Sequence, residues 1–233
     1  MMQHTPNEKP KAVFCWSGGK DSALCLHQVF TENTFDVKYL MTTINAEFNR
    51  ISMHGVRESL LDAQADSIGI PLLKMYVSET SNEAYEKQME KVLLKAKSEG
   101  VEYVIFGDIF LEDLRVYREN NLAKVGMKAV FPLWKKDTKV LIRDLLEQGF
   151  QTITCCVSDK YLDENFVGQI IDTDFLLRLP ANVDPCGENG EFHTFCFDGP
   201  IFKNKIDFAV GEKLYKTTEY QNEEYGFWYC DLY

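Results

Sequence analysis

The stretch Ser17-Gly18-Gly19-Lys20-Asp21-Ser22 decides the predicted fold, because it joins a buried strand directly to a helix. The apolar run 12–16 predicts the strand, and the spacing of apolar residues over 23–30 predicts the helix. Such a junction gathers unpaired backbone N–H groups and the positive end of the helix dipole around one point. The sequence therefore predicts a phosphate-binding turn here.

The residue types of this turn suit that ligand. The two glycines allow positive φ angles or a close approach of the backbone, the two serines offer hydroxyl groups, and Lys20 supplies a mobile cation. Asp21 would repel a phosphate unless it caps the helix, orients Lys20 or holds the Mg²⁺ that accompanies a nucleotide. The spacing fits neither a Walker A loop nor a dinucleotide fingerprint. A serine- and glycine-rich turn without a ligand is the alternative interpretation.

Composition narrows the class of protein. The chain has 233 residues, of which 45% are hydrophobic and 26% charged, as expected of a globular protein with a sizeable core. No apolar run reaches membrane-spanning length, and the first residues lack the apolar centre of a signal peptide, so we expect a cytoplasmic protein that binds no membrane. A net charge of −11 disfavours nucleic acid as a partner. The seven cysteines contain no C-x-x-C pair and are expected to be reduced thiols.

Strands and helices alternate over the first part of the chain. Further strands are predicted at 35–44, 72–77, 101–106 and 129–131, and helices at 57–68, from a capping box at Thr80 to about residue 96, and at 111–122. This order predicts an α/β fold, a doubly wound parallel sheet of about five strands with helices on both faces. Ligands bind such sheets at the carboxyl ends of the strands, where the strand order reverses. We therefore expect the first turn, the loop after Ile44 and the pair Gly107-Asp108 to share one cleft.

The character of the sequence changes after residue 134. A helix at 137–148 and a strand at 150–157 precede short aromatic-rich runs at 192–197, 206–210 and 227–229, which are separated by turn residues and predict antiparallel strands. We therefore predict a phosphate-binding α/β domain over 1–134 and a smaller C-terminal α+β domain over 135–233 that contributes to substrate binding.

A second polar cluster lies in the run 183–195, VDPCGENGEFHTF. In a strand that begins near Glu191, the side chains of Glu191 and His193 would share one face. The carboxylate could then orient the imidazole and raise its basicity, which would make His193 a general base for a nucleophile such as ammonia. Glu188 and Asn189 are candidates for contact with the substrate. A hydrogen-bonded surface turn is the alternative interpretation.

Three further candidates have weaker patterns. His54 follows a polar loop at the predicted cleft and is a candidate substrate contact. Arg115 and Arg118 share a helix face and could clamp an anionic substrate, although pairing on the helix surface explains them equally well. A zinc site at His193 and the nearby cysteines is disfavoured, because no close cysteine pair anchors it.

Four motifs in order resemble those of the diphthine-ammonia ligase family, which belongs to the PP-loop ATP pyrophosphatases. They are SGGKDS at 17–22, FGDIFLEDLR at 106–115, FPLW at 131–134 and DPCGENGEFHTF at 184–195, and the FLEDLR wording is more similar to bacterial relatives. The resemblance implies an adenine nucleotide alpha hydrolase-like fold and an ATP-dependent amidation, in which an acyl adenylate forms, pyrophosphate leaves and ammonia displaces AMP. By position, residues 17–22 would bind phosphate, Gly107-Asp108 would border the nucleotide, and Glu188, Glu191 and His193 would lie toward the acceptor.

The leading hypothesis is therefore an AMP-forming ligase that uses ATP and Mg²⁺ to activate a carboxylate of a small molecule or a protein. Its candidate catalytic residues are Lys20, Asp21, Glu191 and His193, with Asp21 as the candidate Mg²⁺ ligand. Two alternatives stay open, namely an RNA-thiolating enzyme and a regulator that binds ATP without turnover. The residues identify neither the acceptor nor the oligomeric state.

Overall fold

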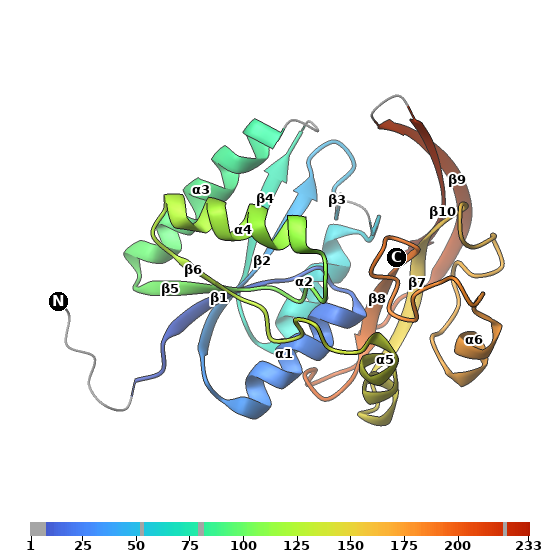
Figure 1. The fold of residues 1–233 in the computed structure, drawn as a ribbon, viewed down its shortest axis with the longest axis horizontal. Coiled ribbons are helices and arrows are strands. Elements are labelled where there is room, and N and C mark those ends of the chain that lie inside the picture. The colour runs from blue at the N-terminus through green and yellow to red at the C-terminus, as the bar shows by residue number, and fades with distance from the viewer. Residues whose placement is uncertain (1–7, 52–53, 79–81, 221–222) are drawn as a thin grey trace.

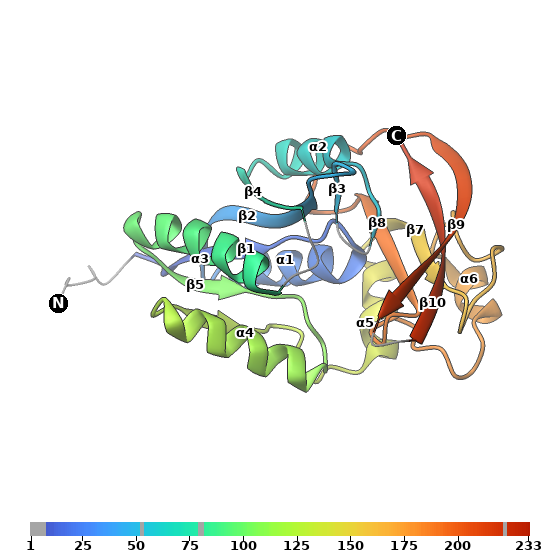
Figure 2. The ribbon, with the colours of Figure 1, turned by 90° about the horizontal axis from the view of Figure 1, so that it is seen from above.

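Two sheets of different kinds organise the chain. The computed structural model describes residues 8–51, 54–78, 82–220 and 223–233. A mostly parallel sheet is formed by the first part of the chain and an antiparallel sheet by the last part, and they lie side by side (Figure 1). Figure 2 shows the C-terminus at the antiparallel sheet.

The first sheet confirms the predicted doubly wound arrangement. Its parallel strands are β1 (Lys11–Cys15), β2 (Asp36–Asn45), β4 (Leu72–Val77), β5 (Val101–Ile105) and β6 (Lys128–Val130). β2 and β4 lie on one side of β1, whereas β5 and β6 lie on the other, so the strand order reverses between β1 and β5. A short strand, β3 (Arg50–Ile51), pairs antiparallel with the end of β2.

Helices cover both faces of this sheet, and the alternation of side chains along β1 explains how. Ala12 and Phe14 belong to a buried cluster with residues of α1 (Lys20–Glu32) and α2 (Glu58–Ile68). Val13 points the other way, into a cluster with residues of α3 (Asn82–Ser98) and α4 (Glu112–Lys124). The capping box predicted at Thr80 falls in part on residues 79–81, which lie outside the described residues.

The second sheet is antiparallel throughout, with the order β8-β7-β10-β9. Its strands are β7 (Gln151–Ser158), β8 (Phe192–Asp198), β9 (Val210–Tyr220) and β10 (Glu223–Leu232), accompanied by α5 (Thr138–Glu147) and α6 (Thr173–Arg178). The strand predicted at 206–210 is wrong, because the strand begins at Val210 and runs on through polar residues. The helix α6, which has six residues, was not predicted from the sequence.

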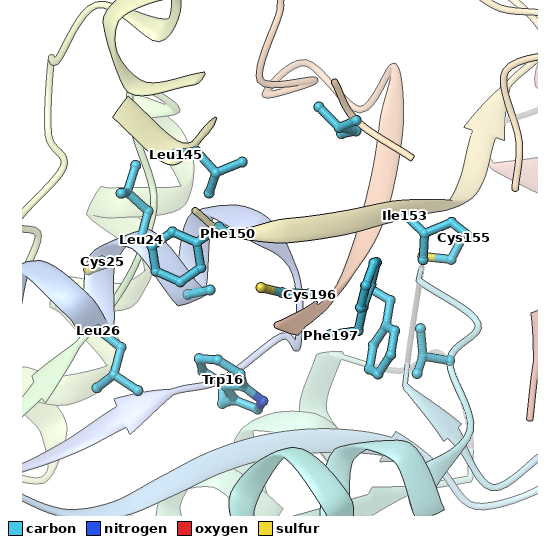
Figure 3. Packing of buried hydrophobic residues seen from close by; sticks show 14 of the residues in the cluster. Trp16, Leu24, Cys25, Leu26, Leu145, Phe150, Ile153, Cys155, Cys196 and Phe197 are labelled. Carbon is cyan, nitrogen blue, oxygen red and sulfur yellow. The ribbon is translucent and has the colours of Figure 1, made fainter. Parts of the chain in front are cut away.

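A single hydrophobic cluster joins the two sheets. It contains Trp16 and Leu24 from the part of the chain that forms the parallel sheet. It also contains Phe150, Ile153 and Phe197 from the part that forms the antiparallel sheet, and Figure 3 shows these side chains around the same space. The boundary predicted between residues 134 and 135 falls in the connection between β6 and α5 and stays a prediction. Within the described ranges, every helix is too short or too polar to cross a bilayer.

Candidate active site

A cleft of about 1410 Å³ opens at the carboxyl ends of β1, β2 and β5. It lies where the strand order reverses, which is the usual ligand position in sheets of this type. The second sheet contributes the loop 187–190 and the start of β8 to its walls. Ligand pockets typically measure roughly 300–1000 Å³, so this cleft has room for a nucleotide and a second substrate together.

The glycines of the turn 17–22 are required by what packs around them. Gly18 has a φ of 76°, and a Cβ there would lie 2.8 Å from Oε1 of Gln64. A Cβ on Gly19 would lie 3.0 Å from Cε1 of His54 and 3.0 Å from the carbonyl oxygen of Thr194. The turn is therefore held tightly against α2 on one side and β8 on another.

Hydrogen bonds inside and outside the turn fix the start of α1. The hydroxyl of Ser17 donates to that of Ser22 (3.1 Å), which donates to the carbonyl of Gly19 (2.9 Å). The backbone N–H of Lys20 donates to Oγ1 of Thr194 on β8 (3.0 Å). One of the N–H groups predicted to face a phosphate is therefore already paired with a residue of the second sheet.

Lys20 and Asp21 form an ion pair at the mouth of the turn. Nζ of Lys20 lies 2.8 Å from Oδ2 of Asp21 and 5.2 Å from the ring centroid of Phe192, and the lysine is only 3% exposed. Burial opposes the ammonium charge, but the adjacent carboxylate leaves the pKa of Lys20 raised. Burial raises the pKa of Asp21, and Lys20 acts against that shift. The pair presents a fixed cation to the cleft.

Among the described residues, no group of three histidine, cysteine, aspartate or glutamate side chains is arranged to hold a metal ion. Mg²⁺ bound with a nucleotide usually takes one or two carboxylates together with phosphate oxygens and waters. Asp21, at the turn itself, fits that smaller role.

The end of β5 forms the wall opposite the second sheet. A Cβ on Gly107 would lie 3.2 Å from the carbonyl oxygen of Asp21, so the glycine lets this strand end pack against the turn. Asp108 pairs with Arg118 (2.7 Å between Oδ2 and Nε), and the guanidinium lies over the ring of Phe106. Burial raises the pKa of Asp108, and the arginine opposes the shift.

The two arginines predicted on one helix face separate in the structure. Arg118 lines the cleft, whereas Arg115 pairs with Glu119 (2.8 Å) and lies over the ring of Trp134, outside the lining of the cleft. Of the two, only Arg118 is placed at the cleft, and the predicted contact of Arg115 with a substrate stays a prediction. Positions three apart are neighbours on a helix face, so the two side chains differ in their partners: Arg115 pairs with Glu119 on the next turn, and Arg118 pairs with Asp108.

Two imidazoles pack against each other beside the turn. The rings of His54 and His193 have centroids 4.7 Å apart, and Nδ1 of His54 lies 3.0 Å from the carbonyl oxygen of Thr194. A carbonyl only accepts, so Nδ1 of His54 carries its proton. Burial lowers the pKa of His54 to about 4 and lowers that of His193 well below its usual range. Both rings are therefore neutral at pH 7, and Nε2 of His193 is buried without a hydrogen-bond partner in the described part of the chain.

Glu191 does not support His193 as predicted. Its carboxylate accepts hydrogen bonds from the backbone N–H of Asp184 (3.0 Å) and of Asn189 (2.9 Å), and the residue is 1% exposed. The carboxylate of Glu191 is therefore taken up by the turn that precedes β8, which begins at Phe192. The neighbour of the His193 ring is His54 instead.

Glu188 links the two walls of the cleft. Its Oε1 accepts from the backbone N–H groups of Ile109 (2.8 Å) and Phe110 (3.3 Å), which follow β5. Burial raises the pKa of Glu188 to about 7. The adjacent Asn189 also lines the cleft.

The structure thus brings most of the predicted site residues together. The predicted site residues that line the cleft are Ser17, Lys20, Asp21, Ser22, His54, Gly107, Asp108, Glu188, Asn189 and His193. Thr194 and Gln64 were missed. The amide of Gln64 donates to the carbonyl oxygens of Gly18 (3.0 Å) and Cys196 (2.6 Å), and the signal for it was a glutamine among the apolar positions of its helix.

The fold and the cleft define a doubly wound α/β protein with a strand–turn–helix site of the kind that binds phosphates. Family models describe this class more closely: the diphthamide synthase N-terminal domain matches residues 10–129 and the diphthamide synthase C-terminal domain matches residues 137–225. The chain belongs to the diphthamide synthase family.

Relatives of this chain include diphthine–ammonia ligases of animals. The protein of that name from Rattus norvegicus is 25% identical over 227 residues, which covers 87% of this chain and 84% of the relative. The one from Homo sapiens is 24% identical over 212 residues, covering 82% and 79%. A solved structure of the U34-tRNA thiolase NcsA from Methanococcus maripaludis aligns with a TM-score of 0.37 at 18% identity, covering 60% of this chain and 57% of that one. A likeness of that size carries no functional argument.

Proposed function

We propose that this chain is an ATP-dependent ligase that adenylates a carboxylate, releases pyrophosphate, and forms an amide with ammonia. The observation that carries the proposal is the position of the Lys20–Asp21 pair, at a glycine turn between strand and helix and at the point where the strand order reverses. Membership of the diphthamide synthase family and relatives named diphthine–ammonia ligase support the same chemistry.

Each step has residues suited to it. The turn 17–22 and Lys20 would hold the β- and γ-phosphates, with Mg²⁺ at Asp21 to neutralise charge on the phosphates. An oxygen of the acceptor carboxylate attacks the α-phosphorus, and the bond to pyrophosphate breaks. Ammonia then attacks the acyl carbon of the adenylate, and AMP leaves with the electron pair of the broken C–O bond.

The neutral imidazoles suit the amidation step. His193 lines the cleft and is uncharged at pH 7, so it can accept the proton that the attacking nitrogen loses. His54, packed against it, keeps the ring in place. We assign Glu191 to the framework of the turn, and we assign Glu188 and Asn189 to the side of the cleft where the acceptor would bind. The acceptor is a carboxylate of a small molecule or of a protein.

The thiolation alternative lacks a reactive cysteine. Cys15 lines the cleft, but burial raises its pKa to about 12, so it is a thiol at pH 7. A thiolate is the nucleophilic form that sulfur transfer uses. No observation in the cleft favours thiolation over amidation.

Product analysis tests the proposal. The protein is incubated with ATP, Mg²⁺, ammonium and a panel of carboxylates, and nucleotides are separated by anion-exchange chromatography. We expect AMP and pyrophosphate in equal amounts, and ADP as the product would contradict the proposal. Exchange of labelled pyrophosphate into ATP, measured with the carboxylate but without ammonium, separates an enzyme from a regulator that binds ATP without turnover.

A further inference from the structure

Thr194 lies at the junction of the two sheets and touches the phosphate turn. It is the third residue of β8, is 2% exposed and lines the cleft. Its Oγ1 accepts a hydrogen bond from the backbone N–H of Lys20 at 3.0 Å, although 174 positions separate the two residues. A residue of the C-terminal sheet therefore sits where the first helix would otherwise present an unpaired donor.

The hydroxyl of Thr194 has a proton left to give. A threonine hydroxyl has one proton and can also accept, and the bond from Lys20 uses only its accepting side. In the described ranges of the chain, this hydroxyl donates to no protein acceptor. A phosphate oxygen can only accept, so a phosphate in the turn would complement the hydroxyl.

Several contacts hold this hydroxyl in place. The carbonyl of Thr194 accepts from Nδ1 of His54 (3.0 Å), which fixes the backbone on the cleft side. Two residues further along β8, the N–H of Cys196 donates to the carbonyl of Gly18 (2.8 Å), and Gln64 donates to both Gly18 and Cys196. The turn and the start of β8 are thus joined as one hydrogen-bonded unit, and the hydroxyl is oriented before any ligand arrives.

We propose that Thr194 is a phosphate-binding residue, whose hydroxyl accepts from the N–H of Lys20 and donates to a phosphate oxygen of the bound nucleotide. This inference rests on the ATP binding of the proposed function. It means that the antiparallel sheet contributes a residue to the nucleotide site, in addition to its proposed role in binding the acceptor.

The test compares Thr194→Val, which keeps the shape and removes the hydroxyl, with Thr194→Ser, which keeps the hydroxyl. ATP affinity is measured by isothermal titration calorimetry on the full chain, and urea unfolding checks that each variant is folded. We expect Kd to rise about 10-fold for Thr194→Val, as for the loss of one hydrogen bond to a charged group, and Thr194→Ser to stay close to the wild type. Should Thr194→Val not fold, Thr194→Ala is compared with Thr194→Ser by the same criterion.

Two results of the titrations would overturn the proposal. One is an unchanged Kd in Thr194→Val, and the other is an equal loss in Thr194→Val and Thr194→Ser. A crystal of the wild type with a non-hydrolysable ATP analogue separates phosphate binding from capping of α1, because the proposal places Oγ1 about 2.7 Å from a phosphate oxygen. A larger separation would leave only the capping role and would also overturn it. If the wild type bound no ATP at all, the proposed function itself would fail, which is a different outcome.

Discussion

The turns 17–22 and 184–191 are both rich in glycine and polar residues, yet they use those residues in opposite ways. In the first turn, Lys20 and Asp21 point their charges toward the cleft. In the second turn, the carboxylate of Glu191 accepts hydrogen bonds from backbone N–H groups of the same turn. The carboxylate of Asp184 accepts hydrogen bonds from the N–H of Cys186 (2.8 Å) and from the hydroxyl of Thr138 (2.7 Å).

The difference shows that a cluster of acids in a sequence does not by itself define a reactive site. A buried carboxylate must be paired or hydrogen-bonded, and the backbone N–H groups of a tight turn are the nearest donors. The acidic turn is therefore largely a framework, and it places Glu188 across the cleft and leads into His193 and Thr194. The turn 17–22 is the one to which the proposed function assigns the reaction.

The largest effect should come from the first turn. Lys20→Ala removes the buried cation, and we expect pyrophosphate release to fall roughly 1000-fold, as for the loss of a charge that stabilises a transition state. The matched control is Lys95→Ala on the exposed surface of α3, which should keep the wild-type rate. Retention of activity in Lys20→Ala would remove the phosphate turn from the mechanism.

The second turn should respond in stability instead. Glu191→Ala leaves the N–H groups of Asp184 and Asn189 without their acceptor, and we expect the free energy of unfolding to fall by about 4 kcal/mol in urea titrations. Glu191→Gln keeps one accepting oxygen and should lose less. The rate of pyrophosphate release per folded molecule of Glu191→Gln should match that of the wild type. A large fall in that rate with unchanged stability would instead assign a catalytic role to Glu191.

The imidazole pair between the turns should make stability depend on pH. The pKa of His54 falls from 6.5 in the unfolded chain to about 4 in the folded one, so the unfolded chain binds more protons between these values. The stabilisation is complete above pH 6.5 and is lost as the pH falls to 4, by at most about 3 kcal/mol.

His54→Asn keeps a donor near Nδ1 and does not titrate, so it isolates this contribution. Urea titrations from pH 7 to pH 4 should show the advantage of the wild type over His54→Asn shrinking as the pH falls. The comparison at each pH cancels the opposite contribution of Glu188, whose pKa is raised to about 7. Parallel curves for the two proteins would mean that His54 is not a buried neutral imidazole.

The smallest effect should come from the contact between the two walls of the cleft. Glu188→Ala removes the acceptor for the N–H groups of Ile109 and Phe110, and we expect KM for ATP to rise about 5-fold because the loop beside Asp108 loosens. Glu188→Gln keeps an accepting oxygen and should retain the wild-type KM. Equal losses of kcat in both variants would assign a direct chemical role to the carboxylate.

The sequence predicted the parallel sheet well because its signals are local. Alternating apolar runs and helical spacings identified the five parallel strands, and the turn 17–22 fixed the position of the cleft. The strand β9 was largely missed because it carries polar, exposed residues such as Lys216 and Thr217, which show no clear alternation.

The details of the site were harder to predict, because they depend on contacts between distant segments. Nothing near Thr194 in the sequence indicates a bond to Lys20, and the orientation of Arg118 rather than Arg115 toward the cleft follows from how α4 packs. Glu191 does not pair with His193, because its carboxylate accepts hydrogen bonds from the N–H groups of Asp184 and Asn189. Local patterns thus predicted the fold and a cleft at the turn 17–22, whereas tertiary packing determined the hydrogen-bond partners.

A structure of the protein with Mg²⁺ and an ATP analogue that resists cleavage between the α- and β-phosphates tests the central claim most directly. We predict that the β- and γ-phosphates lie within about 3 Å of the backbone N–H groups of residues 17–22 and of Nζ of Lys20. A triphosphate bound elsewhere in the cleft, with this turn unoccupied, would contradict the account.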